Sequence, residues 1–109
     1  MPIHEIATLL SETNLGVGTH YSDAKTVLMP GYAIQTQWSG TVTGTIGLQG
    51  RLSEDFGWVD LDGTEYAIAD DSRLYNLREQ HYTEVRAKLV VATGSADTFK
   101  VGYCCKAMY

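Results

Sequence analysis

The sequence predicts an all-β fold, an antiparallel β-sandwich or jelly roll of about eight strands in one domain over residues 1–109. Apolar and polar residues alternate with a period of two in several runs, as in strands with one buried face. The chain has 11 Gly against 2 Pro and many Thr, Tyr and Val, which favours strands and tight turns. A β-barrel shows the same alternation and is the alternative fold.

Residues 3–10 (IHEIATLL) fit neither the strand nor the helix period, so a strand and a short helix both remain open. At the edge of a small sandwich such a segment often lies against a neighbouring subunit, and residues 1–20 are therefore a candidate arm. The polar run that follows predicts a long connection with a short strand near residues 15–19. Another short strand is expected over residues 25–29, before a turn at Pro30-Gly31.

The clearest alternation covers residues 32–52 (YAIQTQWSGTVTGTIGLQGRL). Two runs carry their apolar residues on one face each: Tyr32, Ile34, Thr36 and Trp38 in the first, and Gly44, Ile46, Leu48, Gly50 and Leu52 in the second. A bend rich in Gly, Thr and Ser separates the runs. We therefore predict a β-hairpin in which the second strand returns along the first.

A second hairpin is predicted around Asp62-Gly63, because Asp-Gly is a preferred two-residue turn and alternating runs flank it. In that register Asp60 stands beside Glu65, a like-charge pair that is tolerable only when it is exposed. The other face of the hairpin should then be buried: Val59, Leu61, Tyr66 and Ile68.

Residues 70–80 (DDSRLYNLREQ) are the most polar stretch and predict a crossover loop, with one or two helical turns allowed by the spacing of Leu74 and Leu77. Residues 81–92 and 98–109 alternate clearly and flank a turn over residues 93–97, which predicts another long hairpin. The expected inward residues are Thr83, Val85, Ala87, Leu89 and Val91, answered by Phe99, Val101, Tyr103, Cys105, Ala107 and Tyr109.

We find no pattern typical of a catalytic, cofactor or metal site, and we do not expect an enzyme. The histidines are isolated in the sequence: His4, His20 and His81. The acidic pairs Glu54-Asp55 and Asp70-Asp71 are typical of solvated loops. Residues 60–65 (DLDGTE) are similar to part of a calcium loop, but the remaining ligands are missing at the required spacing.

Cys104 and Cys105 are neighbours, so in a strand their side chains would point to opposite faces and could pair only under strain. We expect free thiols, in a reducing compartment or sheltered by a partner. A formal net charge of -5 without any basic run argues against a nucleic-acid partner. No secretion signal or membrane-spanning apolar run is recognisable, so we expect no membrane association.

Aromatic residues leave a second function open. Trp38 and Trp58, together with several tyrosines, could form a platform for a sugar ring, as in carbohydrate-binding modules. Packing of these rings inside a small sandwich is the interpretation that we favour. A host-type adaptor domain, monomeric and without affinity for capsids, is a further alternative.

Three motifs carry a resemblance to a known family. They are residues 33–40 (AIQTQWSG), residues 44–50 (GTIGLQG) with Trp58 after a short acidic loop, and an ending with Tyr82, Arg86, Gly94, Val101 and Lys106. Over about residues 25–106 the chain resembles small β-sandwich virion proteins of tailed bacteriophages. It departs from their pattern at Arg51, where a Ser is more usual, and at Cys104-Cys105.

The resemblance implies a structural protein of the virion, made in the host cytoplasm. It would be a capsid decoration or cement protein that stabilises the head shell, or otherwise a head-fibre, neck or tail subunit. Its partners would be the major capsid protein or other virion proteins, and a homo-oligomer, favouring a trimer, is expected. Expected contact residues are Ile3, Ile6, Leu9, Leu10, Leu74, Tyr75 and Leu77, and expected fold-holding residues are Trp38, Trp58 and Arg86.

Overall fold

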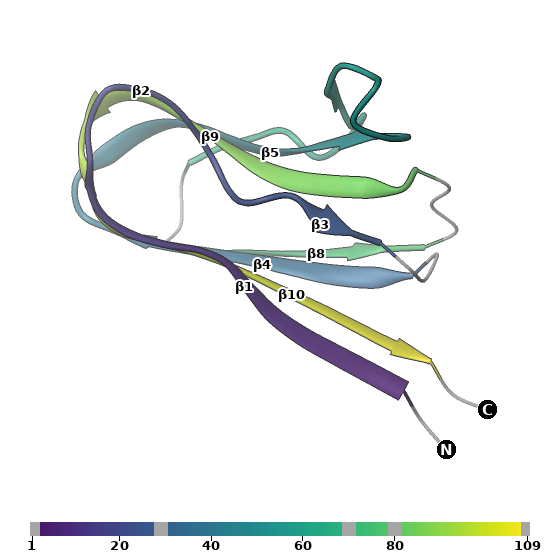
Figure 1. The fold of residues 1–109 in the computed structure, drawn as a ribbon. Coiled ribbons are helices and arrows are strands. Elements are labelled where there is room, and N and C mark those ends of the chain that lie inside the picture. Colours follow the sequence, from purple (N-terminus) through teal and green to yellow (C-terminus); the bar gives the residue numbers. More distant parts are fainter. Residues whose placement is uncertain (1–2, 28–30, 69–71, 79–81, 108–109) are drawn as a thin grey trace.

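The computed structural model describes the backbone of residues 3–27, 31–68, 72–78 and 82–107. Within these ranges every regular element is a β-strand, and ten strands form two antiparallel sheets that face each other (Figure 1). The predicted all-β sandwich is confirmed, with ten strands where about eight were expected. The described residues contain no helix of the length and apolarity needed to cross a bilayer.

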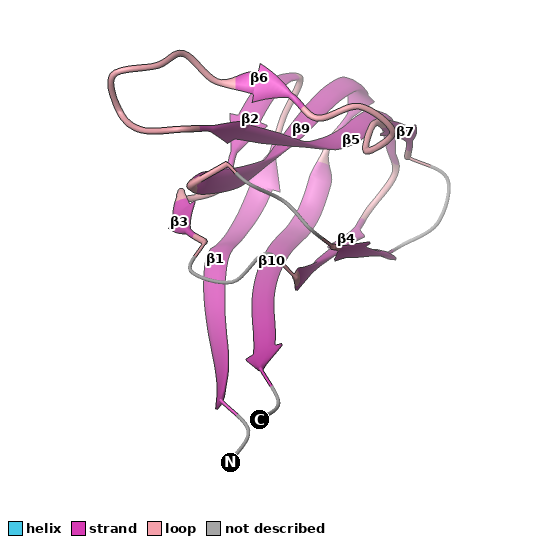
Figure 2. Ribbon diagram, turned by 90° about the vertical axis from the view of Figure 1, so that its right-hand side faces the viewer, coloured by secondary structure: helices cyan, strands magenta, loops and turns pink. Residues whose placement is uncertain are grey.

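The two sheets differ in the lengths of their strands. The four-stranded sheet has the order β1 (Ile3–Leu15), β10 (Ala96–Ala107), β4 (Tyr32–Ser39) and β8 (Ser72–Leu77). The six-stranded sheet has the order β2 (Gly18–Tyr21), β9 (Glu84–Gly94), β5 (Val42–Arg51) and β6 (Val59–Asp60), with β3 (Lys25–Thr26) also paired to β9 and β7 (Tyr66–Ala67) also paired to β5. Strands β1 and β10 run side by side and extend together beyond the sandwich (Figure 2).

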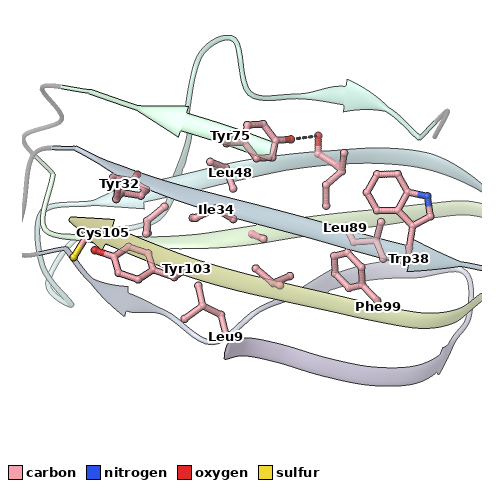
Figure 3. Close-up of a cluster of buried hydrophobic side chains, with 14 of the residues drawn as sticks. Leu9, Tyr32, Ile34, Trp38, Leu48, Tyr75, Leu89, Phe99, Tyr103 and Cys105 are labelled. Carbon is pink, nitrogen blue, oxygen red and sulfur yellow. Dashed lines mark hydrogen bonds between the residues drawn. The ribbon is translucent and has the colours of Figure 1, made fainter. Parts of the chain in front are cut away.

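The core lies between the sheets, and most of its residues lie on the faces that alternation predicted in β4, β5, β9 and β10 (Figure 3). Leu9 of β1 and Tyr75 of β8 were not predicted to belong to it. Its buried members are Leu9, Tyr32, Ile34, Trp38, Ile46, Leu48, Tyr75, Val85, Ala87, Leu89, Val91, Phe99, Val101, Tyr103 and Cys105. Aliphatic and aromatic side chains of this size each contribute about 1.5–3 kcal/mol when they are fully buried. Burial of one face of each long strand therefore holds the two layers together.

The two long predicted hairpins are wrong in their pairing. Strands β4 and β5 are consecutive but lie in opposite sheets, and so do β9 and β10. The chain crosses between the sheets at Gly40, with a φ of 102°, and at Gly94, with a φ of 78°. The two crossings are joined by a hydrogen bond from Ser95 N to Thr41 O of 3.2 Å. Alternation fixes which face is buried, but a buried face can belong to either sheet.

The predicted hairpin at Asp62-Gly63 is also absent, because β6 and β7 pair with successive parts of β5 and not with each other. The turn is closed instead by buried Thr64, whose hydroxyl donates to Leu61 O at 2.6 Å. As a result Val59 is 65% exposed and Tyr66 is 41% exposed, contrary to the buried face that the hairpin predicted. Leu61 and Ile68 of that face are partly buried against the core.

Two other segments differ from expectation. Residues 72–77 form β8, which pairs with β4, where we expected a crossover loop with helical turns. Residues 3–15 form β1, which is hydrogen-bonded to β10 along its length apart from a bulge between Thr8 and Leu10, so this segment is a strand of the sheet and not a separate arm. Of the expected strand over 25–29, β3 covers Lys25–Thr26, and residues 28–30 lie outside the described ranges.

Replacing Gly44 by Ala should destabilise the fold. Gly44 has a φ of 152° at a register shift in β5, and an added Cβ would overlap the backbone carbonyl oxygen of Val90. Because backbone must move to relieve this clash, we expect Gly44→Ala to lower the free energy of unfolding in urea by about 2–4 kcal/mol. Gly16→Ala is the control, since a Cβ added there would have no atom within 4 Å apart from those of Gly16 and its two chain neighbours. An equal effect of the two substitutions would contradict this explanation.

The buried hydroxyl of Tyr75 should make stability fall in alkali. It lies 2.7 Å from Thr64 O and 3.4 Å from Ile46 O, and burial raises its pKa from 10.0 to about 12. Between these values the unfolded chain loses the proton before the folded chain does, so stability is lost as the pH rises through this window. In urea unfolding between pH 10 and 12, the free energy of unfolding of Tyr75→Phe should decline less steeply with pH than that of the wild type. An unchanged slope would show that Tyr75 is not responsible.

Candidate functional site

The described side chains on the outer face of the four-stranded sheet carry very little charge. Its side chains alternate with those of the core, as the strand registers show. The described ones are Ile6, Thr8, Ser11, Thr13, Ala33, Gln35, Gln37, Ser39, Ser72, Leu74, Asn76, Thr98, Lys100, Gly102 and Cys104. Lys100 is the one charged residue of this set, although 19% of the chain is charged. Depletion of charge is typical of the centre of a protein–protein interface.

This charge-poor face presents two large apolar side chains. Ile6 on β1 is 74% exposed, and Leu74 on β8 is 58% exposed. The small residues Gly102 and Cys104 lie on β10 between them, in the rows that contain Leu74 and Ile6. Small side chains allow another surface to approach the sheet closely. The face therefore suits a contact with a second flat surface.

The expected contact residues are divided by the structure. Ile6 and Leu74 lie on the charge-poor face, whereas Leu9 and Tyr75 are buried between the sheets, which differs from the surface position that we expected for them. Leu10 and Leu77 are partly buried against the core. The side chain of Ile3 lies outside the described part of the structure. Alternation along β1 and β8 explains the division, because neighbouring residues point to opposite faces.

The margins of the charge-poor face are edge strands. In the described part of the sheet, β1 and β8 each have a strand partner on one side. At the bulge of β1, Leu9 O accepts a hydrogen bond from Asp23 N of 2.9 Å, so the connection after β2 covers this point of the edge. An edge strand offers backbone donors and acceptors to another chain.

The outer face of the six-stranded sheet is different, because it is charged and carries two ion pairs. Arg51 lies 2.7 Å from Glu84, and Lys88 lies 3.6 Å from Asp60. The amide of Gln49 donates to Asp60 at 2.8 Å, and this hydrogen bond is the main cause that lowers the pKa of Asp60.

Arg86 connects the aromatic residues on this charged face. Its guanidinium carbon lies 3.9 Å from the ring centroid of Tyr21 and 4.4 Å from that of Trp58, and its Nε donates to Gln49 Oε1 at 2.9 Å. Arg51 also lies 4.4 Å from the Trp58 centroid. Burial lowers the pKa of Arg86. These contacts fasten the loop that carries Trp58 to the sheet. The fold-holding role expected for Arg86 and Trp58 stays a prediction.

The two tryptophans bear on the carbohydrate-binding alternative, which requires an exposed aromatic face. Trp38 is buried in the core of the sandwich (Figure 3). Trp58 is half-buried, and the guanidinium groups of Arg51 and Arg86 lie over its ring. Trp38 thus offers no platform, and access to the ring of Trp58 is restricted.

A cleft of about 590 Å³ opens beside Trp58. The loop after β5 forms one wall with Leu52 and Phe56, while Leu61 and Tyr82 lie on the side of the sandwich. Leu52 and Phe56 are exposed. Leu52 was expected on the apolar face of the second strand of residues 32–52, which is wrong because β5 ends at Arg51. Phe56 was missed because it lies in what reads as an ordinary acidic loop. The available signal was an aromatic residue placed between acidic residues and Trp58.

The cysteines and the acidic residues form no metal site in the described part of the chain. Cys104 lies half-buried on the charge-poor face and Cys105 is buried on the opposite side of β10; both are free thiols. No group of three or more described His, Cys, Asp or Glu side chains is close enough together to hold a metal ion.

Comparison with known proteins supports the fold. No protein-family model and no curated protein sequence matches this chain. Among solved structures, the SPBc2 prophage-derived protein YomS is similar over 96% of both chains, with a TM-score of 0.65 and 14% identity. A Bacillus endospore appendage protein, from a family of disulfide-linked pili, matches with a TM-score of 0.55 and 12% identity, over 94% of this chain and 86% of its own. PirA matches with a TM-score of 0.52 and 17% identity, over 94% and 93%. At these identities the likeness shows a shared fold.

Replacing Arg86 should test how the loop of Trp58 is held. We expect Arg86→Ala to lower the free energy of unfolding by about 1–3 kcal/mol, because it removes two ring contacts and the bond to Gln49. Arg86→Lys should recover only part of this loss, since an ammonium cannot stack as a planar guanidinium does. Urea unfolding followed by tryptophan fluorescence measures the free energy of unfolding of the two variants. Lys88→Ala is the control on the same face, and a loss as large as that of Arg86→Ala would contradict the assignment.

Proposed function

We propose that this chain is a structural protein of a bacteriophage particle, and most specifically a decoration or cement protein on the outside of the head shell. The observation that carries the proposal is the charge-poor face of the four-stranded sheet with Ile6 and Leu74 exposed on it. The sequence motifs resemble those of virion proteins of tailed phages, and the fold is shared with a prophage-derived protein. A head-fibre, neck or tail subunit would use the same kind of face.

The proposed partner of this face is the major capsid protein or another virion protein. A homo-oligomer, with a trimer favoured, would present several copies of the face at once to a symmetric shell. Because linked copies bind with an avidity far above that of one copy, a modest contact per subunit would suffice. The proposed site of action is the virion, and the proposed role involves no catalysis.

The carbohydrate-binding module remains the alternative function and has less support. Trp38 is part of the core, and two guanidinium groups lie over the ring of Trp58. A sugar would therefore meet no freely exposed tryptophan face among the described residues. Binding of a glycan that is abolished by Trp58→Ala would favour this alternative over the structural role.

Substitution of Leu74 tests the proposed contact. The purified protein should be oligomeric in light scattering and should co-sediment with phage capsids stripped of it. Leu74→Lys should weaken co-sedimentation by about tenfold or more, because it places a charge in a desolvated contact. Leu52→Lys is the control, since Leu52 is similarly exposed, 56% against 58%, but lies at the end of the other sheet. A monomer that does not bind capsids would refute the proposal.

A further inference from the structure

Three exposed apolar side chains lie around one cleft at the end of the six-stranded sheet. Leu52, Phe56 and Val59 are each more than half exposed, and all three line the cleft beside Trp58. Single exposed apolar residues are common on protein surfaces, but several around one concavity indicate a binding site. This cleft is separate from the charge-poor face, since its residues belong to the other sheet and to the loop after β5.

The floor of the cleft is closely packed, because Gly50 has no side chain and Leu61 and Tyr82 can lie directly over its backbone. A Cβ at Gly50 would lie 3.1 Å from side-chain atoms of both Leu61 and Tyr82, which is too close without adjustment. The hydroxyl of Tyr82 is hydrogen-bonded to that of Tyr32, so the ring of Tyr82 is held in place. The floor is therefore formed before any ligand arrives.

The side of the cleft formed by Trp58 is also fixed. Trp58 is contacted by Arg51 and Arg86, and Arg51 is held in turn by its 2.7 Å ion pair with Glu84. A preformed site binds with a smaller entropic cost than one that must be ordered by its ligand.

The charge around the cleft indicates what kind of ligand it would take. Glu54 and Asp55 are exposed on the loop between Leu52 and Phe56, and the positive charge of Arg51 is compensated by Glu84. The loop beside the cleft thus carries two exposed carboxylates, which oppose nucleic acid and attract cations, while the guanidinium of Arg86 is engaged with the Trp58 ring and Gln49. Most lining side chains are apolar, and those of Arg51 and Tyr82 are already hydrogen-bonded, which leaves few groups for the hydroxyls of a sugar.

We propose that the cleft binds a short peptide segment of a partner protein, one that places a bulky apolar side chain in the cleft and a Lys or Arg beside it, near Glu54 and Asp55. A volume of about 590 Å³ is within the range of ligand sites and larger than one side chain. This inference does not depend on the proposed virion role, because it uses a different surface and is tested with a peptide and not with capsids.

A synthetic peptide of sequence KLKFKLK, with both ends blocked, is the probe. Titrated into the intact isotope-labelled protein, it should bind saturably and shift the NMR signals of the Trp58 indole N–H and the Gly57 amide. Two control peptides, one with Glu in place of each Lys and one with Ser in place of each apolar residue, should bind about tenfold more weakly or less. Absence of saturable binding by the first peptide, or equal binding by either control peptide, would overturn the proposal.

Matched protein variants locate the binding. Leu52→Ser and Phe56→Ser should each weaken binding of the first peptide by about tenfold. The double variant Glu54→Gln, Asp55→Asn should also weaken binding and should make the affinity depend less on salt. Leu74→Ser, at a position of similar exposure on the charge-poor face, should change nothing. All these residues are exposed, and NMR spectra of each variant verify the fold. Binding that survives Leu52→Ser and Phe56→Ser, or displacement of the peptide by cellopentaose, would overturn the assignment to a peptide.

Discussion

The mutual burial of two strand faces is the interaction on which the whole molecule depends. Ile34 and Val101 project from one sheet, Leu48 and Leu89 project from the other, and all four are essentially inaccessible to solvent. With apolar residues of this kind along each long strand, hydrophobic burial fixes the distance between the layers and orients every outward side chain. The charge-poor face and the charged face are both consequences, because each outward residue is set by its inward neighbours.

Alternation in the sequence predicted the buried faces of β4, β5, β9 and β10 but not their partners. A period of two shows which residues share a side, and this holds equally for strands in one sheet and strands in facing sheets. The deciding information lies in the short connections at Gly40 and Gly94, whose positive φ values turn the chain from one layer into the other. A glycine between two alternating runs is compatible with a hairpin as well, so the sequence left the choice undecided.

The two surfaces differed in how far they could be predicted. Ile6 and Leu74 were identifiable as candidates, yet the charge-poor face as a unit appears only when the register places β1, β10, β4 and β8 side by side. Leu9 and Tyr75 were expected on a contact surface but are buried. A segment that contains both apolar and polar residues does not by itself show which of its apolar residues face the core. The cleft beside Trp58 depends on how β6 and β7 pair with β5, and the expected hairpin between them concealed it.

The outermost strands of the two sheets differ in length, so a further strand could pair more readily with one sheet than with the other. On the six-stranded sheet, β2 has four residues and β3, β6 and β7 have two each, which gives a further strand little backbone to pair with. On the other sheet, β1 has 13 residues and continues past the end of the sandwich beside β10. Recruitment of a foreign backbone is thus discouraged in one layer and permitted in the other, so that copies crowded at high concentration would meet through a defined side and would not stack without order.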